Sequence, residues 1–198
     1  MENNKHTEKW LKFLEPENLK NNLIFVSLYV ATFESFKDYV IDEVKMFYQV
    51  GYQNGQELFD PDYDNLVKSK DKKHIDNASL LWFVEMEAIN MEDFESYKIL
   101  RQYRNKLSHE LMSLLFDGLP EELPKMFLIL IQLRVKIEKW WILNLDIPTN
   151  SEHDHKEINE SDIITSSQIF NQIIFDMLSG DEKKANFYKN QFKNGNKI

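Results

Sequence analysis

The sequence predicts an all-α protein, an up-down bundle of about four long helices with a short N-terminal helix and a C-terminal helical appendage. Three observations lead to this fold class. The 198 residues include only 5 glycines and 5 prolines, so long stretches lack residues that break helices. Apolar residues recur at intervals of three and four positions over several long segments. No segment alternates apolar and polar residues over the length of a strand.

Two helices and a polar connection are expected in the first part of the chain. A short leading helix spans 7–14 and ends at the step into Pro16, a residue that suits the first turn of the next helix. That next helix spans 16–50, and only Lys37 interrupts its apolar stripe. The segment 52–75 is polar and rich in turn residues, which is typical of a loop with one short helix.

Three more long helices are expected in the middle of the chain. One spans 76–89. Asn90 suits the N-cap of the next, which runs to Asp117, where Gly118 provides a natural end. The fourth long helix spans 125–145 and stops before a proline.

These elements predict three parts of the chain. Residues 1–148 form the helical bundle domain, and 149–160 form a polar linker without apolar periodicity. Residues 161–198 form the C-terminal appendage, with a helix over 161–179 followed by a basic tail. No internal repeat links the parts.

Composition excludes several functional classes. The net charge of −9 argues against a broad, charge-driven coating of nucleic acid, although it allows a local basic site. The absence of cysteine excludes disulfides, thiolate metal sites and a cysteine nucleophile. The polar start is unlike a secretory signal, and the most apolar run, 23–33, is shorter than the ~20 residues that span a bilayer. A cytoplasmic protein without a membrane segment is therefore expected.

One polar stretch of the third long helix stands out. Between Ser96 and His109 there are four basic residues and no acidic one. At about 100° per residue, the polar side chains here form one continuous arc of roughly 140°. Within that arc, Asn105 and His109 are neighbours one turn apart, so the amide can orient the imidazole. The full arc consists of Arg101, Arg104, Asn105, Ser108 and His109.

The spacing of Arg104 and His109, with Asn105 directly after the arginine, resembles the Arg-x4-6-His signature of the HEPN superfamily. In that family the signature lies on the third long helix of an α-helical bundle. The resemblance covers roughly 16–148 in helix order, and only the six-residue motif is specific. It implies a metal-independent RNA endonuclease of a toxin–antitoxin, phage-defence or RNA-processing system, with no cofactor.

The resemblance also assigns roles to residues. His109 would exchange a proton with the ribose 2′-hydroxyl or the leaving oxygen, since histidine titrates near neutral pH. Arg104 would stabilise the negative charge that gathers on the phosphate in the transition state. The expected catalytic residues are Arg104, Asn105 and His109, and the expected RNA contacts are Arg101, Lys106 and Ser108.

The expected partners are RNA, a second copy of the chain, and an antitoxin or defence-system protein. The homodimer is expected because Arg104 and His109 lie about 140° apart around one helix and converge only if two helices cross. Leu111 and Leu115 flank the arc and would supply the apolar part of that contact. Some toxins of the family carry a modified tyrosine two residues after the histidine, but Leu111 occupies that position here.

Several alternatives remain open at this point. The same face would also serve a non-catalytic bundle that binds a nucleotide, an RNA or a protein. The segment 60–71 has an aspartate spacing similar to a calcium-binding loop, without the central glycine. His153 and His155 in the linker form a weak metal motif. Trp140 and Trp141 fit a core better than a stacking platform for bases, and the C-terminal lysines fit a solvated helix better than an RNA contact.

Overall fold

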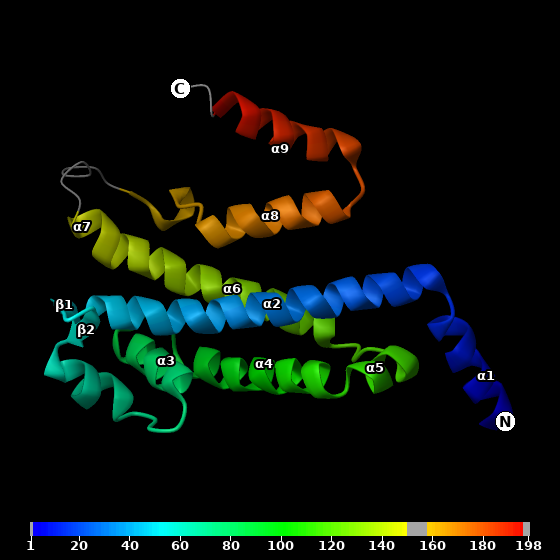
Figure 1. The fold of residues 1–198 in the computed structure, drawn as a ribbon, viewed down its shortest axis with the longest axis horizontal. Coiled ribbons are helices and arrows are strands. Elements are labelled where there is room, and N and C mark those ends of the chain that lie inside the picture. Colours follow the sequence, from blue (N-terminus) through cyan, green and yellow to red (C-terminus); the bar gives the residue numbers. More distant parts are fainter. Residues whose placement is uncertain (1, 150–157, 196–198) are drawn as a thin grey trace. The chain divides into compact units, whose positions relative to one another are not determined.

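The computed structural model describes residues 2–149 and 158–195, and within them the chain is mostly helical (Figure 1). The all-α class is therefore confirmed, with one small addition, a two-stranded sheet. No helix in these ranges is long and apolar enough to cross a membrane.

The first two helices meet at Pro16. Helix α1 spans Glu2–Phe13, which begins earlier than predicted, and α2 spans Pro16–Phe47. The predicted apolar stripe of α2 faces the core over most of its length. Its buried residues are Val26, Tyr29, Phe33, Phe36, Val40 and Val44.

A β-hairpin follows α2, where a loop was predicted. Strand β1 (Gln49–Gln53) pairs antiparallel with β2 (Gln56–Phe59). Asn54 and Gly55 form the turn, both with positive φ. The amide of Asp60 donates to the carbonyl oxygen of Tyr48 at 2.8 Å, which ties the hairpin to the end of α2. A π-helical segment, η1 (Tyr63–Lys68), then leads to the next helix.

Helices α3 (Ile75–Glu85) and α4 (Met91–His109) both pack against α2 and against each other (Figure 1). The predicted start of α4 is confirmed, because Asn90 and Asp93 form a reciprocal capping box. Tyr97 is fully buried at the centre of this packing, with its ring 5.4 Å from that of Phe33 on α2. This aromatic contact fixes α4 against α2.

The prediction of a single helix that runs to Asp117 is wrong, because the helix is interrupted at Glu110. Helix α4 ends at His109 and a separate short helix, α5 (Leu111–Asp117), follows. Glu110 has φ −116° and ψ 19°, which is outside the helical range. Gly118 ends α5 with a positive φ of 104°, as its position predicted.

The remaining elements are helical. Helix α6 spans Leu123–Trp141 and passes into a π-helical segment, η2 (Ile142–Asp146), and a short α7 (Ile147–Thr149). Most of the predicted linker, 149–160, lies outside the described residues. A 3-10 turn, η4 (Glu160–Asp162), precedes α8 (Ser166–Leu178) and α9 (Glu182–Gly195).

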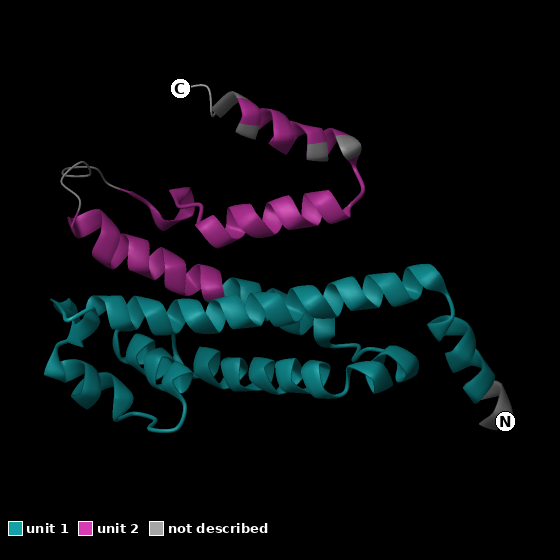
Figure 2. Cartoon of the chain, viewed as in Figure 1, with its two compact units in different colours: residues 1–133 teal, residues 134–198 magenta. Residues whose placement is uncertain are grey.

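The chain divides into two compact units, residues 1–133 and 134–198 (Figure 2). Unit 1 contains α1 to α5 and the first part of α6, where Phe127 lies against Phe25 and Tyr29 of α2. Unit 2 contains the rest of α6 and the helices after it, with Ser167 of α8 donating to Glu138 of α6 at 2.5 Å. The predicted boundaries at 148 and 160 remain a prediction.

Candidate functional site

All six predicted site residues lie on α4, within unit 1. Leu100 and Leu107 are buried and hold the opposite side of this helix in the core. The phenol of Tyr29 on α2 donates to the carbonyl oxygen of Leu100 at 3.0 Å, which fixes the register of the two helices. The polar arc is therefore carried by a helix with a defined position against α2 and α3.

Arg104 forms an ion pair with Glu34 of α2. Both side chains are half-buried, and Lys37, one turn further along α2, contacts the same carboxylate. Burial raises the pKa of Glu34, but the contacts with Lys37 and Arg104 outweigh it and hold that pKa below its usual range. The other terminal nitrogen of Arg104, Nη1, donates to Oδ1 of Asn105 at 3.1 Å.

Arg101 belongs to a different network, on the side of α4 that faces α3. Its guanidinium donates to Asn77 and lies 3.7 Å from Oδ2 of Asp76. The phenol of Tyr97 donates to that same oxygen at 2.6 Å, and Asp71 accepts from the Asn77 amide at 2.7 Å. The structure thus places Arg101, a predicted RNA contact, in a mostly buried structural network.

The outer part of the arc faces solvent. Asn105, Lys106, Ser108 and His109 are exposed. In the described part of the chain, the His109 side chain has no hydrogen bond or ion pair. His109 is also the last residue of α4, one position before the break at Glu110. The predicted arc therefore has an inner edge, Arg101 and Arg104, that pairs with other helices, and an outer face that is exposed to solvent.

The break at Glu110 changes the surroundings of the arc. Leu115, predicted to form an apolar contact with a second copy, is only 6% exposed and packs inside its own unit. It is therefore not available to a partner chain. Met112 on α5, close to His109 in the sequence, is an apolar side chain that is 70% exposed.

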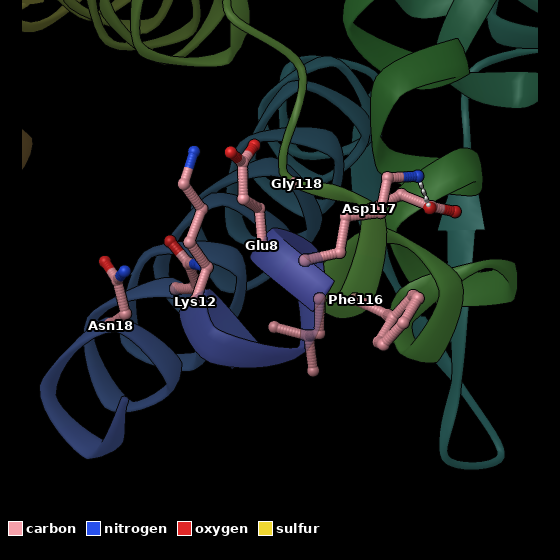
Figure 3. Close-up of a pocket in the computed structure, with 9 residues that line it drawn as sticks. Glu8, Lys12, Asn18, Phe116, Asp117 and Gly118 are labelled. Atoms are coloured by element: carbon pink, nitrogen blue, oxygen red, sulfur yellow. Dashed lines mark hydrogen bonds and ion pairs between the residues drawn. The ribbon is translucent and has the colours of Figure 1, made fainter. Parts of the chain in front are cut away.

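Two hollows lie near α4 and α5. Lys106 lines a shallow cavity of about 320 Å³ together with Gln102 and Tyr103. Another, of about 440 Å³, lies between α1, α2 and α5 and contains none of the predicted site residues (Figure 3). At its edge Lys9 of α1 binds Asp117 at 2.5 Å, and this ion pair lowers the pKa of Asp117.

Two segments were alternative candidates for metal binding, and the structure describes only the first of them. In 60–71, Asp60 and Asp71 accept hydrogen bonds from nearby backbone amides. Within residues 2–149 and 158–195 no cluster of three or more His, Asp or Glu side chains is placed to hold a metal ion. The linker motif with His153 and His155 lies outside the described residues.

Sequence reasoning missed the residues that hold the two arginines. Glu34 lies on α2, Asp76 and Asn77 lie on α3, and no motif in the sequence pairs them with an arginine. One signal was present, because Lys37 interrupts the apolar stripe of α2 and Glu34 lies one turn before it. A polar pair on an otherwise buried helix indicates an internal partner.

Comparisons of the chain with models of protein families, with curated proteins and with solved structures found no match.

Proposed function

We propose that the chain is a cytoplasmic, metal-independent RNA endonuclease of the HEPN type. In this proposal it is a toxin, a phage-defence component or an RNA-processing component, and an antitoxin or defence-system protein is its partner. The finer architecture, an up-down bundle of about four long helices, is part of the same proposal.

The observation that supports it most is the accessibility of His109 within the same helix that carries Arg104. A proton-transfer residue must reach its substrate, and His109 is exposed, as are Asn105 and Ser108 beside it. From Ser96 to His109 no carboxylate lies on the helix to repel a phosphate.

The chemistry needs only these side chains. His109 would take the proton of a ribose 2′-hydroxyl as its oxygen attacks the neighbouring phosphorus. The bond from phosphorus to the 5′-oxygen of the next nucleotide then breaks, and that oxygen receives a proton from the protonated His109. The products are a 2′,3′-cyclic phosphate and a 5′-hydroxyl end. Arg104 would stabilise the charge on the non-bridging oxygens during this step.

The working unit in this proposal is a homodimer. Arg104 and His109 are five residues apart, which puts them about 140° apart around α4. Two copies of α4 that cross about a two-fold axis would bring the histidine of one copy near the arginine of the other. Ser108, small and exposed at the middle of the arc, would permit the close approach.

Cleavage of single-stranded RNA in excess EDTA tests the proposal. We expect 2′,3′-cyclic phosphate ends from the wild type and none from His109→Ala. The melting temperature should be nearly unchanged, because an exposed side chain without partners contributes little to stability. An all-DNA oligonucleotide, which lacks the 2′-hydroxyl, is the matched substrate control. Equal cleavage by the wild type and His109→Ala would contradict the assignment.

A second candidate function is supported by the ion pair of Arg104. Because Glu34 already pairs with Arg104, the arginine also fits a structural role in a non-catalytic bundle. Such a protein would bind a nucleotide, an RNA or a protein through the exposed residues of α4. RNA binding by the wild type, without cleavage under any condition tested, would favour this alternative.

A further inference from the structure

Two cations converge on one carboxylate between α2 and α4. The ammonium group of Lys37 and the guanidinium of Arg104 both contact Glu34. Two positive charges and one negative charge give this cluster a net charge of +1, although the net charge of the whole chain is −9. All three side chains are only half-buried, with about 30% of each exposed to solvent.

The ion pair with Glu34 leaves one N–H donor of Arg104 without a hydrogen bond in the described part of the chain. Oε1 of Glu34 forms the ion pair with Nη2 of Arg104, while the neighbouring Nε–H, like this Oε1, is buried and has no hydrogen-bond partner among the described residues. Nε and Nη2 form one edge of the guanidinium, and this edge can hold two oxygens of a single anion at once. A buried donor without a partner is destabilising, so an anion that reaches both nitrogens would remove this destabilisation.

We infer that Arg104 and Lys37 form a phosphate-binding subsite across α2 and α4, which the carboxylate of Glu34 occupies until a phosphodiester displaces it. A phosphodiester has two non-bridging oxygens with a shared negative charge, which matches a guanidinium edge beside an ammonium group. Glu34 is then an internal competitor of the ligand, and Lys37 is a binding residue on a helix that the motif does not include. That the phosphodiester belongs to RNA rests on the proposed function.

The subsite is tested by binding rather than by cleavage. The probe is a fluorescein-labelled single-stranded oligonucleotide that carries 2′-O-methyl groups throughout, so that it cannot be cut, and anisotropy gives its Kd. We expect Glu34→Gln to bind about three- to tenfold more tightly than the wild type, because a like charge near the phosphate is removed. Lys37→Gln, introduced into the Glu34→Gln protein, should reverse that gain.

A matched control lies on the same helix. Glu17 pairs with Lys20 at the same three-residue spacing, but both are well exposed and no arginine from α4 joins them. Glu17→Gln removes an equal charge from α2, so it measures the general effect of net charge on affinity. An effect of Glu34→Gln no larger than that of Glu17→Gln, or a weaker affinity, would overturn the subsite.

The outcomes separate this inference from the proposed function. Tighter binding by Glu34→Gln together with RNA that is never cleaved would keep the subsite and reject the ribonuclease. Cleavage by the wild type with unchanged or weaker binding by Glu34→Gln would keep the ribonuclease and reject the subsite. If Glu34→Gln fails to fold, Lys37→Gln in the wild-type background decides: weaker binding is expected, and an unchanged Kd would overturn the subsite.

Discussion

Arg101 and Arg104 lie one turn apart on α4, but different helices hold them. Arg101 packs over the ring of Tyr97, with its guanidinium carbon 5.1 Å from the ring centre, and reaches Asp76 on α3. Burial, together with the adjacent Asp76 carboxylate, raises the pKa of Tyr97, so its phenol stays protonated and continues to donate. Arg104 reaches α2 instead and keeps contact with the exposed face.

The network of Arg101 predicts a loss of stability when this side chain is removed. Arg101→Ala leaves Asp76, which is 8% exposed, without its cation, so the free energy of unfolding should fall by about 1–3 kcal/mol. Urea denaturation followed by circular dichroism measures it. Lys106→Ala on the same helix is the control, because Lys106 is exposed and should change stability by less than about 0.5 kcal/mol.

The same experiment distinguishes two roles of Arg101. The sequence alone assigned it to RNA binding, because it lies on the polar arc with Arg104. An Arg101→Ala protein as stable as the wild type would favour that assignment over a structural one. Spacing along a helix predicts which residues share a face, but it does not predict which distant helix will pair with them.

The sequence predicted helix ends correctly where a specific residue marks them. Pro16, Asn90 and Gly118 lie where the structure starts or ends a helix. The hairpin was missed although Asn54-Gly55 is a strong turn signal, since its strands are short, polar and irregular in register. The break at Glu110 has no proline or glycine, so no local signal indicates it.

Hydrogen bonds to one carboxylate connect α8 and α9, the two helices after the linker. Asp176 of α8 accepts from Lys184 of α9 at 2.5 Å and from the phenol of Tyr188 at 2.7 Å. These hydrogen bonds lower its pKa from 3.8 to about 2. A carboxylate whose pKa is lower in the folded state stabilises that state fully above its unfolded pKa and loses this effect as the pH falls through the folded value.

We therefore expect α8 and α9 to lose stability as the pH falls from about 4 to about 2. Far-ultraviolet circular dichroism in urea over this range would detect the loss. Asp176→Asn should be less stable at neutral pH and should lack this part of the pH dependence. Asp146→Asn, which changes an exposed carboxylate in the same unit, is the matched control, and identical acid profiles for Asp176→Asn and the wild type would contradict the prediction.

The proposed homodimer depends on which side chains near the arc reach the surface. The sequence placed Leu115 at the contact between two copies, but this side chain is buried in its own unit. Ser108 is exposed near the centre of the arc, so a substitution at Ser108 is the better test of the homodimer. Burial in a single chain depends on distant contacts, and for that reason helical spacing did not reveal that Leu115 packs inward.

We expect Ser108→Arg to give a folded monomer without nuclease activity. A long, charged side chain at the middle of the arc would keep the two copies of α4 apart, while its own chain tolerates it at an exposed position. Light scattering at micromolar concentration measures the assembly. Ile99→Arg, at another exposed position of α4 outside the arc, should remain dimeric, and a wild-type monomer that cleaves RNA would reject the composite site.

The break at Glu110 also has a consequence for amide hydrogen exchange. The amide groups of Leu111, Met112 and Ser113 begin α5 without a capping side chain, and no hydrogen bond to them occurs in the described part of the chain. These amides should exchange with deuterated water within seconds, while those of Tyr97 and Leu100 are protected by the core. The segment directly after His109 would thus report ligand binding, because any RNA that orders it would slow its deuterium uptake.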